Sequence, residues 1–173
     1  MIGTVILSHG LESGPAATKV TAMAAAAAAI GWHSLRPDYR DLDAANGLAG
    51  APARLDRLLA AARAIDGPLV LSGSSFGAFI SGLASLSVPT RGLFLLALPL
   101  RLLHFDRAFD CAPVPTTIIH GWDDELIPAR AVVDFAAQRH LELHLVNDSH
   151  RLSDHVEVCA RRLAEFLQAL PAP

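Results

Sequence analysis

The sequence has few cysteines and no long apolar segment, and each shortage excludes a class of protein. Its two cysteines, Cys111 and Cys159, lie far apart among 173 residues and fit neither a disulfide framework nor a metal cluster. The chain has no uninterrupted run of about 18 apolar residues, so we expect no membrane-spanning helix. The first ten residues lack the basic segment and small-residue cleavage site of a signal peptide. We therefore expect a soluble protein in a reducing, cytoplasmic setting.

Positive charge is also scarce. The chain carries 14 Lys and Arg against 17 Asp and Glu, a net charge of −3. No basic cluster predicts a nucleic-acid partner or an anionic membrane surface. The histidines do not share metal-ligand spacing. The chain contains neither a Gly-Lys-Ser/Thr ending nor a G-x-G-x-x-G motif after a strand, so we expect no nucleotide-binding site. The sequence thus predicts no metal, no cofactor, no nucleic acid and no membrane partner.

The chain is rich in apolar residues, which make up 52% of it and fall into short runs that alternate with helical patterns. We expect strands over residues 4–9, 33–39, 68–73, 92–98, 115–121 and 141–147. Helices are expected over residues 16–30, 52–65, 76–87 and 128–138, and a last helix with Ser153 as N-cap carries an apolar stripe of Val156, Leu163, Phe166 and Leu170.

This alternation predicts an α/β fold: a three-layer α/β/α sandwich with about six parallel strands. No repeat or linker divides the chain, so residues 1–173 are expected to form a single domain. Residues 141–147 alternate between apolar and polar, which suits an edge strand. Residues 99–115 fit neither pattern and predict a loop or a small lid.

Polar residues follow several expected strands. In an open α/β sheet, ligands bind outside the carboxyl ends of the strands, so residues just past each strand are the candidates for a site. A serine, an acid and a histidine fall at separate strand ends in that chain order, within the segments Gly73 to Gly77, His120 to Asp124 and Asn147 to His150.

The segment GSSFG, residues 73–77, matches G-x-S-x-G with Ser75 at its centre. The glycines allow a sharp turn from strand to helix, which exposes the serine hydroxyl at the top of the sheet. The N–H groups of the following helix point toward any oxyanion formed there. Ser74 is the competing nucleophile, but its side chain should point away from the apex. We therefore predict that Ser75 is the nucleophile.

Four stretches, LSHGLESGPAATK, VLSGSSFGAF, IIHGWDDELIP and DSHRL, resemble the α/β-hydrolase superfamily, and within it the small, cap-less YqiA-type esterases. The resemblance covers nearly the whole chain and implies a minimal α/β-hydrolase fold with no cap domain. It implies Ser75 as nucleophile and His150 as general base and then general acid. The pattern H-G-x-x-D-x-x-(I/V)-P places the orienting acid at Asp124, with Asp123 as the alternative.

The resemblance also implies an oxyanion hole formed by the backbone N–H groups of Leu11 and Phe76. His9, Glu12 and Trp122 are candidates for the substrate pocket, although His9 is also interpreted as a structural residue that bonds loop backbone. Asp148 is expected to cap the loop that carries His150.

These residues predict a serine hydrolase that cleaves small carboxylic esters or thioesters through an acyl-enzyme on Ser75. The expected partner is a small-molecule ester or thioester, and the same residues also suit amide hydrolysis. The alternative is a non-catalytic binding or interaction protein on the same scaffold, since fold does not fix function. The oligomeric state is not predicted.

Overall fold

The computed structural model describes residues 1–171, and its strands form one parallel sheet in the order β2-β1-β3-β4-β5-β6. The strands are β1 (Thr4–Ser8), β2 (His33–Leu35), β3 (Leu69–Ser74), β4 (Gly92–Leu96), β5 (Thr116–Gly121) and β6 (Glu142–Val146). The helices are α1 (Thr18–Ala29), α2 (Arg40–Asn46), α3 (Ala51–Arg63), α4 (Phe76–Ser85), α5 (Ala129–Arg139) and α6 (Val156–Ala169), with 3-10 turns at Gly47–Gly50 and Ser153–His155.

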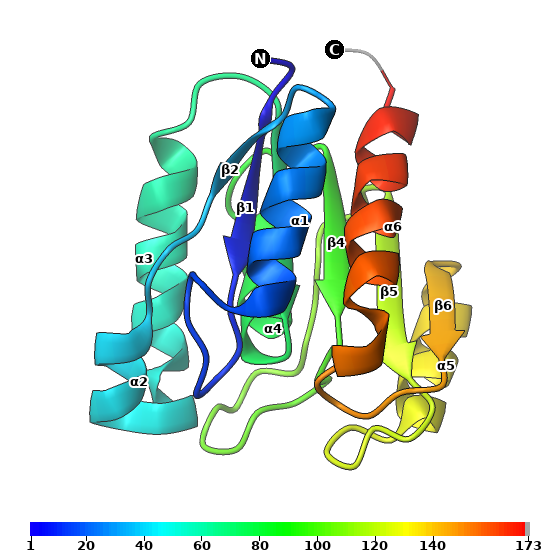
Figure 1. The fold of residues 1–173 in the computed structure, drawn as a ribbon. Helices are drawn as coiled ribbons and strands as arrows, with labels where there is room; N and C mark the ends of the chain where they lie inside the picture. The colour runs from blue at the N-terminus through cyan, green and yellow to red at the C-terminus, as the bar shows by residue number, and fades with distance from the viewer. Residues whose placement is uncertain (172–173) are drawn as a thin grey trace.

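Helices cover both faces of the sheet, as Figure 1 shows. Helices α1 and α6 lie side by side on one face. Met23 of α1 and Leu163 of α6 belong to the same buried apolar cluster as Val5 and Phe94 of the sheet. Helices α3, α4 and α5 cover the other face. Neighbouring residues along each strand alternate between the two cores, and the central strands β3 and β4 are almost wholly buried. The predicted three-layer α/β/α sandwich with parallel strands is therefore confirmed, and β6 is an edge strand as expected.

Two local predictions are wrong. The strand expected over residues 33–39 ends at Leu35, because Pro37 has no N–H to donate to a ladder and the N–H of Tyr39 donates to His9 instead. Ser153 is not the N-cap of the last helix. It begins a 3-10 turn, and α6 starts after His155 with no side-chain cap hydrogen bond.

The register of the sheet brings separate segments of the chain together at its carboxyl edge, the lower end in Figure 1. Ser8 pairs with Gly73, which places the loop after β1 beside the turn after β3. Gly121 pairs with Val146, which places the loop after β5 beside the loop after β6. Both described chain ends lie at the opposite edge.

The irregular segment after β4 is anchored in the core by one aromatic residue. Phe109 is buried and contacts the rings of Phe79 and Phe135. A methyl group built at Gly82 of α4 would lie 2.1 Å from the Phe109 ring, so the segment packs directly on that helix. An ion pair between Asp110 and Arg139 adds a second attachment.

Candidate active site

The turn between β3 and α4 holds Ser75 in a conformation that side chains rarely adopt, with φ 53° and ψ −116°. Two glycines permit the turn. A methyl group at Gly73 would lie 2.3 Å from the carbonyl carbon of Gly77, and one at Gly77 would lie 2.1 Å from the carbonyl oxygen of Ser8. Such a strained residue between a strand and a helix is the geometry of a nucleophile elbow.

A line of hydrogen bonds joins three predicted residues. Ser75 Oγ lies 2.9 Å from His150 Nε2, and His150 Nδ1 lies 2.8 Å from Asp124 Oδ2. The carboxylate only accepts hydrogen bonds, so Nδ1–H donates to Asp124 and leaves Nε2 free to accept the Ser75 hydroxyl proton. The structure thus brings together Ser75, His150 and Asp124, whereas the alternative acid Asp123 is exposed.

The side chain of Asp124 is fully buried, and the loop after β5 supplies its donors. Its Oδ1 accepts the backbone N–H groups of Leu126 at 2.9 Å and Ile127 at 2.7 Å. Burial alone would raise the pKa of Asp124, but the hydrogen bonds from His150, Ile127 and Leu126 outweigh burial and hold this pKa below its ordinary value. Asp124 therefore stays ionised and able to orient His150.

The loop that carries His150 is held from two sides by residues that the sequence analysis missed. The backbone N–H of His150 donates to the Glu125 carboxylate at 3.0 Å. Lys19, from α1, donates to the carbonyl oxygen of Arg151 at 2.7 Å. Both residues lie within stretches that carry the family resemblance, LSHGLESGPAATK and IIHGWDDELIP, but their contacts with the histidine loop are visible only once the loops are placed in space.

Asp148 caps this same loop, as expected. Its carboxylate accepts hydrogen bonds from the backbone N–H groups of Ser149 and Asp154 and from His155 Nδ1. Burial would raise the pKa of Asp148, yet these bonds outweigh it and lower the pKa. Asp148 therefore ties the start of the loop to the turn that leads into α6.

The loop after β1 approaches the nucleophile at Gly10. A methyl group there would lie 3.3 Å from the carbonyl oxygen of Ser74 and 3.6 Å from Ser75 Cβ. Leu11, the predicted oxyanion donor, directly follows Gly10, and Phe76 begins α4 directly after Ser75. Both peptides therefore lie next to the candidate nucleophile.

His9 bonds loop backbone, as its structural interpretation expected, and its place in a substrate pocket stays a prediction. Its side chain is fully buried, and its two ring nitrogens bond backbone: Nδ1–H donates to the carbonyl oxygen of Gly10 at 2.7 Å, and Nε2 accepts the N–H of Tyr39 at 3.0 Å. Glu12 and Trp122 are exposed. His120 is buried and contacts the carbonyl oxygen of Ile127 at 2.9 Å, so it shapes the acid loop.

An apolar cavity of about 420 Å³ borders the acid loop. It lies between the segment after β4 and helix α5, and Arg101 is the charged residue in its lining. The apolar lining consists of Leu100, Ala108, Phe109, Leu126, Ile127, Pro128, Ala131 and Phe135.

Among the described residues, no helix is long and apolar enough to cross a membrane, and no group of His, Cys, Asp and Glu side chains is arranged to hold a metal ion.

The parallel sandwich with a G-x-S-x-G turn at the carboxyl edge defines an α/β-hydrolase fold. The chain is 49% identical to a Xanthomonas campestris pv. campestris protein classed in the α/β-hydrolase superfamily, over 97% of this chain and 99% of that protein, with a TM-score of 0.93. The chain therefore belongs to the α/β-hydrolase superfamily, as the resemblance implied. The narrower likeness to YqiA-type esterases stays a prediction.

More distant structures share the fold. Est1E from Butyrivibrio proteoclasticus, in its structure with ferulic acid bound, is 20% identical with a TM-score of 0.74, over 97% of this chain and 89% of that protein. The esterase Pf2001 from Pyrococcus furiosus is 16% identical with a TM-score of 0.75, over 97% of this chain and 82% of that protein. No family model and no curated protein matches the chain.

Proposed function

We propose that this protein is a serine hydrolase that cleaves small carboxylic esters or thioesters through an acyl-enzyme on Ser75. The observation that carries the proposal is the hydrogen-bonded line from Ser75 through His150 to the buried carboxylate of Asp124. A serine hydroxyl is a weak nucleophile at neutral pH, and an adjacent imidazole in the correct tautomer activates it.

The chemistry follows from this order of side chains. His150 Nε2 takes the hydroxyl proton as Ser75 Oγ bonds to the carbonyl carbon, and the carbonyl electron pair moves onto oxygen. Collapse of the tetrahedral species breaks the bond to the leaving group, which receives the proton from His150. Water then attacks the acyl-enzyme, with His150 again as base, and releases the acid and free Ser75. Asp124 stabilises the imidazolium in both halves of the reaction.

The developing oxyanion is assigned to the backbone N–H groups of Leu11 and Phe76. Preorganised donors of this kind stabilise charge as it forms, and the loss of one typically slows catalysis by about 100- to 1,000-fold. Phe76 N–H belongs to the first turn of α4, which adds the favourable dipole of a helix N-terminus.

The apolar cavity beside the acid loop is the proposed site of the acyl chain. Its lining is apolar apart from Arg101, and it shares Leu126 and Ile127 with the loop that holds Asp124. Ala131 lies on its α5 side, so Ala131→Phe would fill part of it. We expect this variant to lower kcat/KM for p-nitrophenyl octanoate relative to p-nitrophenyl acetate. An unchanged ratio would remove the cavity from the acyl site.

The primary experiment is covalent labelling with a fluorophosphonate, followed by intact mass and peptide mapping. We expect wild-type protein to be labelled at Ser75 and Ser75→Ala to be unlabelled. Ser74→Ala is the matched control, because Ser74 is the adjacent hydroxyl and should leave labelling intact. Absence of labelling in folded wild type would favour the binding-protein alternative. Matched oxygen ester, thioester and amide substrates then separate the three hydrolase activities.

A further inference from the structure

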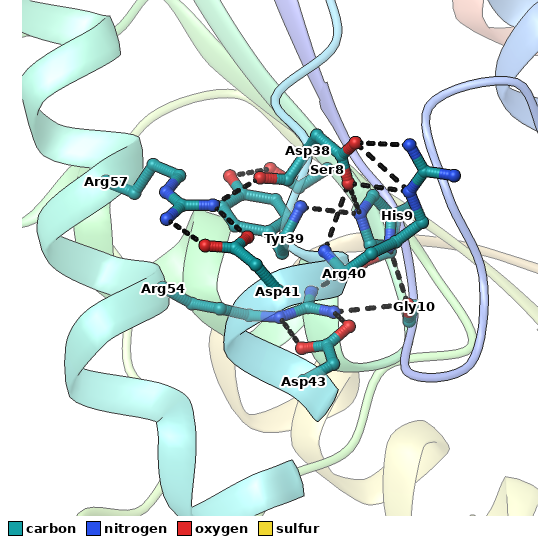
Figure 2. A network of polar contacts seen from close by, with 10 residues as sticks. All are labelled: Ser8, His9, Gly10, Asp38, Tyr39, Arg40, Asp41, Asp43, Arg54 and Arg57. Carbon is teal, nitrogen blue, oxygen red and sulfur yellow. Dashed lines mark hydrogen bonds and ion pairs between the residues drawn. The ribbon is translucent and has the colours of Figure 1, made fainter. Parts of the chain in front are cut away.

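Arg54 of α3 is fully buried although it carries a charge, and four of its five N–H donors bind groups at the site end of the sheet. Its Nε and Nη2 bind the carboxylate of Asp43 as a fork. Its Nη1 donates to the carbonyl oxygen of His9 at 2.7 Å, and Nη2 also donates to that of Gly10 at 3.2 Å. Figure 2 shows this network from α3 to the loop after β1.

The guanidinium also lies between two aromatic rings. Its central carbon is 4.5 Å from the centre of the Tyr39 ring and 4.2 Å from that of Phe76. A charge buried this deeply is costly unless it is paired and hydrogen-bonded, and Asp43 supplies the pairing. An apolar side chain at position 54 would stabilise the fold about as well, since buried ion pairs add little net stability. The specific geometry of Arg54 therefore needs another explanation.

The geometry of the peptide bond supplies that explanation. The carbonyl oxygen of Gly10 and the N–H of Leu11 belong to the same planar, trans peptide, so they point in opposite directions. A donor that fixes the direction of the oxygen thereby fixes the direction of the N–H. His9 Nδ1–H, at 2.7 Å, and Arg54 both bind this oxygen.

We propose that Arg54 is a positioning residue for the oxyanion hole: by holding the carbonyl oxygens of His9 and Gly10, it orients the Leu11 N–H toward the oxyanion formed at Ser75. The inference rests on the proposed serine-hydrolase function. Arg54 also contacts the ring of Phe76, which carries the second oxyanion donor. One buried side chain thus binds the carbonyl group of the peptide that carries the Leu11 N–H and also contacts Phe76.

The variant Arg54→Met tests the proposal, because methionine fills similar space but donates no hydrogen bond. We expect kcat for p-nitrophenyl acetate, per site titrated with fluorophosphonate, to fall by about 10- to 100-fold, because one donor is misdirected rather than removed. KM should change by less than about threefold. Affinity for a methyl trifluoromethyl ketone, whose adduct carries the same oxyanion, should fall by a factor similar to that of kcat.

Two further variants separate positioning from folding. Arg57→Met is the matched control, because Arg57 also lies on α3, binds the Asp41 carboxylate as a fork and donates to a backbone carbonyl, that of Asp38, without contacting His9 or Gly10. It should keep kcat within about threefold of wild type. Arg54→Lys keeps the charge but lacks the planar fork, so it should give an intermediate loss of kcat.

A crystal structure of Arg54→Met provides a readout that does not depend on catalysis. We expect a rotated Gly10–Leu11 peptide. An unrotated Gly10–Leu11 peptide would overturn the positioning role of Arg54. Failure of the wild type to react with fluorophosphonate would overturn only the proposed function, so the two failures are distinguishable. The inference is equally overturned where Arg54→Met keeps wild-type kcat and inhibitor affinity per titrated site. If Arg54→Met does not fold, Arg54→Lys decides by the same criteria.

Discussion

Gly121 and Asp148 are in backbone contact, and there is no room for a side chain between them. A methyl group at Gly121 would lie 2.2 Å from the carbonyl oxygen of Asp148 and 2.8 Å from that of Ser149. This contact holds the acid loop against the histidine loop. The distance between Asp124 and His150 therefore depends on a glycine that takes no part in the chemistry.

Gly121→Ala should push the two loops apart. We expect kcat per titrated site to fall by about 10-fold or more, since small misplacements of reacting groups are costly, and the free energy of unfolding to fall by about 1–3 kcal/mol from overpacking. Ester kinetics and thermal melting measure the two effects. Gly14→Ala is the control, because its nearest contact would be the exposed Arg40 side chain at 3.2 Å rather than backbone. Equal behaviour of the two variants would contradict the role assigned to Gly121.

Asp124→Asn should separate the two neighbouring acids. An amide at position 124 can hold the wrong imidazole tautomer, so we expect kcat to fall by about 1,000- to 10,000-fold with the fold intact. Asp123→Asn should retain kcat within about threefold, because Asp123 is exposed and does not contact His150. Kinetics with circular dichroism on both variants provide the measurement. A large loss in Asp123→Asn alone would assign the acid to the other residue.

Ser75→Gly should be more stable than Ser75→Ala. Both variants lose the hydroxyl that contacts His150, but alanine keeps a Cβ at φ 53° and ψ −116° while glycine does not. We expect glycine to raise the free energy of unfolding by about 1 kcal/mol relative to alanine, or the Tm by about 2–4 °C. At Ser74, a strand position, the same pair should rank in the opposite order. The same ranking at both positions would remove the argument for strain.

Asp148 should make the fold sensitive to acid. Its pKa in the folded protein lies below the ordinary value of 3.8, so its contribution is complete above about pH 4 and is lost as the pH falls through the folded value. Asp148→Asn should lower the free energy of unfolding at pH 7 by about 1–3 kcal/mol, and its difference from wild type should shrink below about pH 4. Urea unfolding from pH 3 to pH 7 tests this, with the exposed Asp154→Asn as control. A difference that does not vary with pH would contradict it.

The sheet and the turn at Ser75 were predictable because their signals are local. Apolar runs such as residues 93–96 of β4 indicate burial directly, and the glycines at 73 and 77 indicate the turn. Helix α2 was missed because RDLDAAN carries no apolar stripe and buries no residue. Its place depends on charges that pair with α3, such as Asp41 with Arg57, and such pairing is not visible in a local pattern.

The unusual burial of Arg54 is indicated by one feature of the sequence. It precedes Leu58 and Ala62 by four and eight residues, so it lies on the buried stripe of a predicted helix where an arginine is unexpected. That spacing indicates a buried charge in need of a partner. It does not identify the partner, because Asp43 and the carbonyl groups of His9 and Gly10 come close to Arg54 only through the fold.

Strand β6 lies at the edge of the sheet but leads into the loop that carries His150. It pairs with β5 alone, and its residues are only partly buried, yet the loop that carries His150 leaves its end. Edge strands with few buried contacts open locally at a lower free energy than the core. Heating should therefore inactivate the protein before it unfolds, because strand β6 frays while the candidate nucleophile Ser75, which directly follows the buried strand β3, is still in place.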